Sequence, residues 1–332
     1  MESEFLQNIA NYKPRYFNNS KVSIWHKLPI SRRSAVLVIL FLGKSGELRV
    51  VLSKRSRKLR SFPGNIALPG GRADTGLESE WQTARRETEE EIGISQSDLI
   101  LKEKFGCSID QINLFPCYLS RTFLAVTPCI GFLKWSPSKL KSFEDQHISS
   151  VMLNPGESSS IFSVPLKDFL QPKPRNEKLK ECLKSKHITT KWGDLPWQYR
   201  SFIFPIDNPN EVKWLDEVQD LSSSEEETAK EIELNDLGEK IKIRDVWGLT
   251  ANILHDLADI TYNGSKAYDK EIGEEELLNA LHEEGGQLST KQRTDYELKM
   301  MNHTSAKNAS FKEYLSKETF QKLQKIYNGN VA

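Results

Sequence analysis

Residues 69–94 read PGGRADTGLESEWQTARRETEEEIGI. Two glycines and a short polar loop lead into a run of residues that favour a helix. Positions i, i+3 and i+4 of an α-helix share one face, and Glu87, Glu90 and Glu91 have this spacing. The neighbouring stripe, which we expect to seal against a core, consists of Trp81, Ala84, Thr88 and Ile92. The sequence therefore predicts a helix with one acidic face directly after a glycine turn.

An acidic helix face favours a cation-binding role. Like charges at this spacing destabilise an isolated helix by about 0.2–0.5 kcal/mol per pair. Mg²⁺ prefers carboxylate oxygens and is commonly shared with substrate phosphates. A run of three glutamates is most often a solvated helix face, and we interpret the two other runs, 225–227 and 274–276, as surface. The first run differs because glycines precede it, Arg86 introduces it, and Gly93 follows as an expected left-handed helix end. The pattern indicates a metal-assisted enzyme acting on phosphoryl or diphosphate groups.

These residues resemble the Nudix box. Its pattern runs Gly, five residues, Glu, seven residues, then Arg-Glu-apolar-x-Glu-Glu-x-Gly-apolar. From Glu78 onward the match is complete if Thr88 counts in the apolar slot. Upstream, six residues rather than five separate Gly71 from Glu78.

The Nudix resemblance implies roles for the box residues. Glu87, Glu90 and Glu91, with the turn at Gly71, would hold Mg²⁺ or Mn²⁺ beside a diphosphate. Arg86 would pair with a box carboxylate, and we count it with the three glutamates as catalytic. Family members differ over which glutamate is the base, and outside the box the candidates are Glu144 and Glu157.

A second motif directly upstream narrows the family. Residues 51–71 read VLSKRSRKLRSFPGNIALPGG. They resemble the signature of the coenzyme A diphosphatase branch: Leu-Leu-Thr-x-Arg-Ser, three residues, Arg, three residues, Gly, three residues, Phe-Pro-Gly-Gly. The departures are mild and fall at Val51, Ser53 and Leu68. The resemblance covers roughly residues 33–260 with gaps, and the length and insertions are most like the fungal peroxisomal members of this branch.

The branch resemblance implies a substrate. It implies cleavage of coenzyme A, or of its derivatives, into adenosine 3′,5′-bisphosphate and 4′-phosphopantetheine or an acyl form of the latter. Arginine suits bidentate phosphate recognition, so we expect Arg55, Ser56 and Arg60 to contact the substrate. The alternative is a pool-sanitising hydrolase acting on oxidised purine nucleoside triphosphates such as 8-oxo-dGTP. A regulatory Nudix module is disfavoured because the box carboxylates are all present, and RNA decapping because no long basic stripe is visible.

Composition limits partners and location. The charge is balanced, with 46 basic and 46 acidic residues, so no nucleic acid partner is expected. The longest apolar run, 35–42, is far shorter than the roughly 20 residues that span a bilayer. Four cysteines without Cys-x-x-Cys spacing, and an N-terminus unlike a signal peptide, favour an intracellular protein with reduced, mostly buried thiols. The resemblance implies a peroxisome, although residues 330–332 are not a Ser-Lys-Leu address; the cytoplasm is the alternative.

The alternation of strand-like and helix-like segments argues for an α/β protein. The resemblance implies a Nudix-type α/β/α sandwich with a mixed central sheet, plus a helical C-terminal extension. We expect an N-terminal arm at 1–30, a Nudix domain at 31–262 with polar insertions at about 171–191 and 222–240, and a polar helical tail at 263–332 that leaves self-association open. Local expectations are a strand hairpin at 34–54, a hairpin across 193–194, a mobile loop at 222–240 and a helix at 244–260. The box helix begins at Ser79, with Gln82 completing a capping box, or after a competing cap at Thr75.

Overall fold

The computed structural model describes residues 2–16, 21–136, 146–148, 150–170, 180–222, 230–233, 240–302 and 309–329. Its helices are α1 Glu2–Asn11, α2 Glu80–Ile92, α3 Asp98–Ile100, α4 Lys213–Asp216, α5 Gly248–Asn263, α6 Glu275–Glu283, α7 Asp295–Met301 and α8 Lys317–Gly329. Its strands are β1 Arg33–Leu42, β2 Leu48–Arg55, β3 Ile66–Ala67, β4 Gly70–Arg72, β5 Cys107–Leu114, β6 Tyr118–Leu119, β7 Ala125–Trp135, β8 Ser158–Pro165, β9 Lys184–Trp192, β10 Leu195–Pro205, β11 Lys230–Glu233 and β12 Lys240–Trp247.

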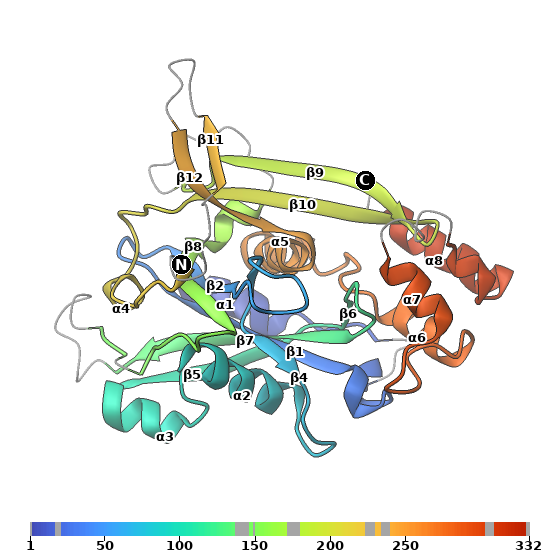
Figure 1. Ribbon diagram of the computed structural model, residues 1–332, viewed down its shortest axis with the longest axis horizontal. Helices are drawn as coiled ribbons and strands as arrows, with labels where there is room; N and C mark the ends of the chain where they lie inside the picture. The colour runs from blue at the N-terminus through green and yellow to red at the C-terminus, as the bar shows by residue number, and fades with distance from the viewer. Residues whose placement is uncertain are drawn as a thin grey trace.

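An eight-stranded mixed sheet forms the centre of the molecule. Its main path runs β3-β2-β1-β7-β5, with β4 beside β1, β6 beside β7 and β8 beside β2. Strand β1 runs antiparallel to β2, as the predicted hairpin requires, and parallel to β7. Figure 1 shows α2 and α3 beneath this sheet and α5 above it. The predicted α/β sandwich with a mixed central sheet is confirmed.

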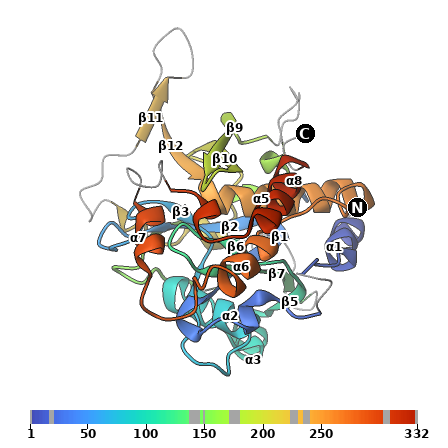
Figure 2. The same ribbon diagram turned by 90° about the vertical axis from the view of Figure 1, so that its right-hand side faces the viewer.

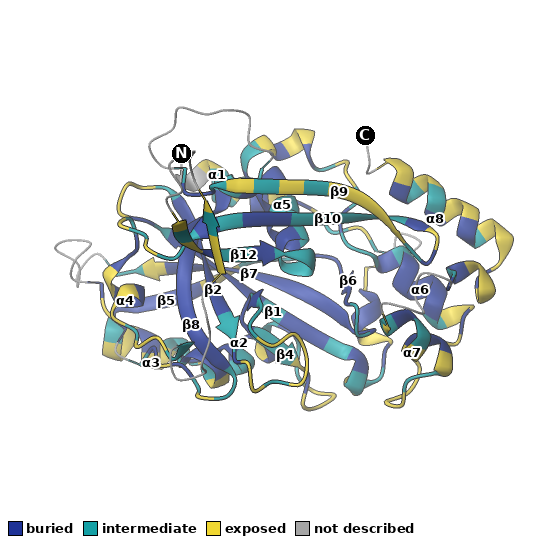
Figure 3. Cartoon of the chain, turned by 45° about the horizontal axis from the view of Figure 1, so that its top comes forward, coloured by how far each residue is buried: buried dark blue, intermediate teal, exposed yellow. Residues whose placement is uncertain are grey.

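Strand β1 explains why the sheet is covered on both faces. Successive side chains of a strand point to opposite faces. The odd-numbered residues of β1 from 35 to 41 join a buried cluster with Ala84 and Ile92 of α2. Val38 and Leu40 join a different cluster, which contains Leu254 and Leu257 of α5. Because both faces are apolar, β1 needs a helix on each side, and Figure 3 shows it as a largely buried strand.

A second sheet of four strands, in the order β11-β12-β10-β9, lies beyond α5 (Figure 1). The hairpin predicted across Gly193 and Asp194 joins β9 to β10, and both turn residues have positive φ, at 58° and 66°. This is the backbone combination that a tight two-residue hairpin turn requires.

Two local predictions in this region were wrong. Lys230–Glu233, predicted to lie in a mobile loop, forms β11 and pairs with β12. Residues 244–247, predicted as helix, form the end of β12, and α5 begins only at Gly248. Tertiary pairing explains the second error, since Val246 lies opposite Phe202 of β10 and is fully buried there. The remaining residues of the predicted loop, 223–229 and 234–239, lie outside the described residues.

The C-terminal helices α6, α7 and α8 pack beside the sheets (Figure 2). Leu277, Leu281 and Phe311 share a buried cluster with Trp25 of the N-terminal segment and Phe123 of the central domain. Trp192 and Trp197 also face this cluster, with their rings 4.8 Å apart, so these strand aromatics serve packing.

The interpretation of residues 274–276 as surface was wrong. Glu275 is buried, and its carboxylate accepts hydrogen bonds from the Ser23 hydroxyl at 2.5 Å and from the Ile24 and Cys117 N–H groups at 2.9 and 3.0 Å. Glu274 accepts the Leu119 N–H at 2.8 Å. These acids anchor the start of α6, a role that composition alone does not reveal. The run at 225–227 lies outside the described residues.

The four cysteines, at positions 107, 117, 129 and 182, are free and buried, as predicted. Among the described residues, none of the helices combines the length and apolar composition that crossing a bilayer requires.

Candidate active site

The box helix α2 begins and ends where the sequence predicts. The Ser79 hydroxyl accepts the Gln82 N–H at 3.2 Å, and the Gln82 side chain accepts the Ser79 N–H at 2.9 Å, which completes a capping box. Gly93 ends the helix with φ of 73° and donates its N–H to Glu89. A side chain at this glycine would lie 2.2 Å from the Ser150 carbonyl oxygen, so only glycine fits. Both ends of α2 are therefore fixed, which holds its acidic face in place.

Arg86 gathers the carboxylates of the box. Its Nε donates to Glu78 Oε1 at 2.7 Å, and its Nη1 lies 3.1 Å from both Glu87 Oε1 and Glu90 Oε2. Nη2 donates to the Arg72 carbonyl at 2.8 Å, which ties the helix to β4. The arrangement confirms that Arg86 pairs with box carboxylates.

Glu78 is the residue whose place the sequence left least certain, because the loop before it is one residue too long. The structure brings it into the cluster. Besides Arg86, its Oε2 accepts the Asp74 N–H at 2.9 Å and the Thr83 hydroxyl at 3.2 Å. Burial opposes ionisation of Glu78, but its bonds to Arg86 and Asp74 outweigh that effect and lower its pKa. The longer loop is thus absorbed without displacing Glu78.

The glycine turn lies directly against Glu87. A Cβ added to Gly71 would lie 2.3 Å from Glu87 Oε2, so only the missing side chain lets the two approach. Gly70, with φ of 150°, would place a Cβ 2.4 Å from the Ala35 carbonyl oxygen. The Ser34 hydroxyl donates to the Gly71 carbonyl at 2.6 Å and thereby fixes its direction. The sequence gives no signal for this contact of Ser34, which depends on the pairing of β1 with β4.

Glu91 is the most enclosed of the three box carboxylates. Its Oε2 accepts the Gly70 N–H at 3.1 Å, and its Oε1 lies 3.9 Å from Arg55 Nη1. Burial raises the pKa of Glu91 to about 8, against the opposing effects of that N–H and of Arg55. Burial also raises the pKa of Glu87, although Arg86 opposes it. A nearby cation favours the ionised form of a carboxyl, so both groups are suited to receive one.

The donor set fits a hard divalent cation. Glu78, Glu87, Glu90 and Glu91 outnumber the two arginines that contact them, Arg86 and Arg55, and hard cations prefer oxygen ligands. Within the described residues, no three acidic, histidine or cysteine side chains are already gathered as a ligand set. The contacts of Arg86 explain this, because they draw Glu87 and Glu90 toward its guanidinium. Binding a cation would exchange those contacts.

The three residues that we expected to contact the substrate differ in how they lie relative to the box. Arg55 lies beside Glu91, and its Nε is buried without a hydrogen-bond partner in the described structure. Ser56 is fully buried, and its hydroxyl accepts the Lys58 N–H at 3.2 Å. Arg60 is exposed, and no contact described for this part of the chain joins it to the box.

Of the two candidate bases outside the box, Glu157 lies near Glu91. It contributes to the raised pKa of Glu91, and its carbonyl accepts the Ser56 N–H at 2.9 Å. Glu144 lies outside the described residues. A separate hollow lies between β2, β3 and β12, lined among others by Lys54, Asn65, Arg244 and Trp247, but none of the box glutamates lines it.

Comparisons with known proteins place this geometry in a family. The NUDIX domain family model matches residues 31–185. The chain is 39% identical to the peroxisomal coenzyme A diphosphatase 1 of Saccharomyces cerevisiae over 90% of this chain and 89% of the yeast protein. It is 30% identical to a peroxisomal coenzyme A diphosphatase of Mus musculus, over 43% of this chain and 50% of the mouse protein. A crystal structure of a C. elegans Ap4A hydrolase complex covers 41% of this chain and 81% of its own, at 22% identity and a TM-score of 0.28.

Family membership follows from the long match to the yeast relative and from the match to the box from Glu78 onward. Enzymes of this family are hydrolases that generally use divalent metal ions. The chain belongs to the Nudix hydrolase family.

Proposed function

We propose that this protein hydrolyses the diphosphate bond of coenzyme A and its derivatives. The products are adenosine 3′,5′-bisphosphate and 4′-phosphopantetheine, or the acyl form of the latter. The observation that carries the proposal is the contact between the two motifs: Arg55 of the upstream motif lies 3.9 Å from Glu91 of the box. A phosphate-binding arginine therefore stands beside the carboxylate cluster, where a diphosphate would meet both.

The box residues supply the metal site in this proposal. Glu87, Glu90, Glu91 and the turn at Gly71 would hold Mg²⁺ or Mn²⁺, and the cation would neutralise the diphosphate oxygens and orient the attacking water. Arg86 acts on the carboxylates, since its bonds hold Glu78 against β4 and restrain Glu87. Water adds to one phosphorus as the bridging oxygen leaves with the other, so each product keeps a terminal phosphate.

Substrate recognition is assigned to Arg55, Ser56 and Arg60. Arg55 is the best placed, because its guanidinium lies near Glu91 and its Nε has no hydrogen-bond partner among the residues that the structure describes. Ser56 contributes through the backbone, since its N–H bond to the Glu157 carbonyl holds the loop that follows β2. Exposed Arg60 would reach the substrate from that loop. A guanidinium suits the 3′-phosphate that distinguishes coenzyme A from its 3′-dephosphorylated form.

The names of two relatives support a proposal about location. Yeast and mouse proteins similar to this chain are named as peroxisomal enzymes, so we propose a peroxisomal location here. We also propose the division into an arm at 1–30, a catalytic domain at 31–262 with insertions at about 171–191 and 222–240, and a tail at 263–332 whose role in self-association is open to test by sedimentation.

Product analysis by mass spectrometry tests the substrate. Purified protein with Mg²⁺ should convert coenzyme A to the two named products, faster than it converts 3′-dephospho-coenzyme A or 8-oxo-dGTP. Equal efficiency for coenzyme A and its 3′-dephosphorylated form would argue against a 3′-phosphate clamp by the arginines. Faster turnover of 8-oxo-dGTP would replace the proposal with a nucleotide-pool function.

A further inference from the structure

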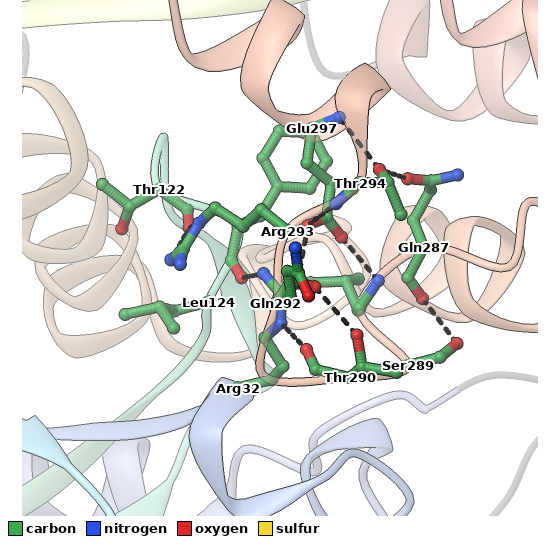
Figure 4. Close-up of polar contacts among 12 residues, drawn as sticks. Arg32, Thr122, Leu124, Gln287, Ser289, Thr290, Gln292, Arg293, Thr294 and Glu297 are labelled. Carbon is green, nitrogen blue, oxygen red and sulfur yellow. Dashed lines mark hydrogen bonds and ion pairs between the residues drawn. The ribbon is translucent and has the colours of Figure 1, made fainter.

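A buried arginine outside the box is held almost entirely by the C-terminal tail. Arg32, only 1% exposed, immediately precedes β1. Its Nε donates to the Thr290 carbonyl at 2.7 Å, and its Nη2 donates to the Gln292 carbonyl at 3.2 Å and to Glu297 Oε2 at 2.6 Å. Figure 4 shows the tail loop curving around this guanidinium. Its Nη1 donates to the Phe123 carbonyl at 3.1 Å, so all three guanidinium nitrogens have acceptors.

Glu297, in the tail, is the ionic partner of Arg32. It is fully buried in α7, and its Oε1 accepts the Leu288 N–H at 2.7 Å. Its Oε2, besides Arg32, accepts the Thr294 N–H at 3.2 Å, which caps α7 (Figure 4). Burying two charges is costly unless they are paired and hydrogen-bonded, as these are. The pair therefore fixes where the tail docks on the start of β1.

The start of β1 holds the glycine turn of the active site. The Arg33 carbonyl accepts the Ala73 N–H at 3.1 Å, and the Ser34 hydroxyl donates to the Gly71 carbonyl at 2.6 Å. Ala35 pairs directly with Gly71 in the sheet. The residues of β1 that contact the glycine turn therefore follow Arg32 by only one to three positions along the chain.

The tail also contacts the chain just before β1, at Ser23 and Ile24. Glu275 of α6 accepts hydrogen bonds from the Ser23 hydroxyl and the Ile24 N–H. Two residues further on, His26 Nε2 lies 3.0 Å from Glu80 in the first turn of the box helix. The segment from Ser23 to Ala35 therefore contacts the tail through Glu275, and it also contacts the box helix α2 and the glycine turn in β4.

We propose that Glu297, acting through Arg32, is a positioning residue for the hydrolytic site. The tail holds the start of β1, and β1 in turn holds the backbone of Gly71 against the Glu87 carboxylate. Residues that orient metal ligands from behind change metal affinity by about 10–100-fold when they are replaced. The inference rests on the proposed metal site, and it makes the tail part of the catalytic structure.

The experiment measures Mn²⁺ half-saturation and turnover in folded variants. Single changes at the pair leave a buried charge unpaired, so the main variant is the apolar double change Arg32→Met with Glu297→Leu, which removes both charges. It should need about tenfold more Mn²⁺ for half-maximal activity, and about tenfold more to fill the site in direct titration. The substrate KM at saturating Mn²⁺ should stay near the wild-type value. Glu313→Gln, which breaks an exposed ion pair with Lys299 in the same tail, is the matched control and should behave as wild type.

A second variant keeps the proposal testable if the double variant does not fold. Ser34→Ala leaves the Arg32–Glu297 pair intact and removes only the hydroxyl bond to the Gly71 carbonyl. It should raise the Mn²⁺ requirement in the same direction. A folded double variant, or Ser34→Ala, with wild-type Mn²⁺ affinity would overturn the positioning role. A wild-type protein that binds no Mn²⁺ would instead overturn the proposed metal site.

Discussion

Among single residues, Arg86 decides which carboxylates of the site are free to bind a cation, because it hydrogen-bonds to several of them. Arg86 contacts four carboxylates, those of Asp74, Glu78, Glu87 and Glu90. The side chain of Glu78 is 18% exposed and that of Glu90 is 50% exposed. Glu78 also accepts bonds from Asp74 and Thr83, whereas Glu90 is held by Arg86 alone among its described contacts. A divalent cation can therefore draw Glu90 away from Arg86 while Glu78 remains in place.

Gly71 gives a sharp test at this scale. In Gly71→Ala the new Cβ would meet the end of the flexible Glu87 side chain at 2.3 Å, so the carboxylate must rotate while the backbone can stay. We expect a melting temperature close to wild type and a turnover at least about tenfold lower, as for a displaced metal ligand. Gly76→Ala, in the same loop, meets only Ile30 Cδ1 at an ordinary 3.4 Å and should keep full activity. Steady-state kinetics and thermal unfolding of both variants check this, and wild-type turnover in Gly71→Ala would contradict it.

Much of the residue-level picture was predictable from spacing. The shared helix face of the glutamates follows from positions three and four apart. The pairing of Arg86 with box carboxylates was expected from the resemblance to the Nudix box. The contacts of Ser34 and Arg32 do not, because they depend on which distant strand or helix lies beside them. The position of Glu78 was also hard to predict, because its loop is one residue longer than in the family pattern. Local bonds to Asp74 and Arg86 nevertheless hold Glu78 in the carboxylate cluster.

At the scale of elements, the start of α6 is stabilised by acids with shifted ionisation. Burial raises the pKa of Glu274 to about 8, although its bond from the Leu119 N–H opposes this. In the unfolded chain the same group would titrate near 4.5. Between these two values the folded protein binds the proton more tightly. Stability that is present below about pH 4.5 is therefore lost as the pH rises toward 8, by up to about 1.4 kcal/mol per pH unit.

Glu274→Gln should remove this dependence. The amide keeps an oxygen to accept the Leu119 N–H and cannot ionise. Its free energy of unfolding should fall less steeply than that of wild type between pH 5 and 8, so the variant gains relative stability toward pH 8. Urea unfolding at several pH values measures the slopes. Glu283→Gln, on the same helix at a half-exposed position, is the control. Parallel curves for Glu274→Gln and wild type would show that the buried carboxyl is not the source.

The elements that were predicted well are those with strong local signals. The caps of α2 and the turn at 193–194 depend on short combinations of residue types that are typical of helix caps and tight hairpin turns. The start of α5 was misplaced because Val246 also fits a helical period, and only its pairing with Phe202 of β10 makes it part of a strand. Acidic residues at 274–276 resemble a solvated run until Ser23 and Cys117 are brought against them.

At the scale of the whole molecule, distant parts of the chain join around one site. The N-terminal segment, the box and the tail meet where Arg32, Gly71 and Glu297 are linked through β1. Figure 2 shows α6 and α7 next to the N-terminal segment and the central sheet. Apolar contacts predict that the tail docks on the core, but the buried charge pair that sets its position is visible only in the folded chain. Separating the tail should therefore affect both folding and metal binding.

Electron paramagnetic resonance, which counts bound Mn²⁺, shows whether the box glutamates gather a divalent cation for diphosphate hydrolysis. Glu90→Gln should fold as wild type, lose about 10–100-fold in Mn²⁺ affinity and lose turnover with it. The matched change Glu89→Gln, at the neighbouring residue that accepts a bond from Gln96, should leave both unchanged. Wild-type Mn²⁺ binding and turnover in Glu90→Gln would contradict the account.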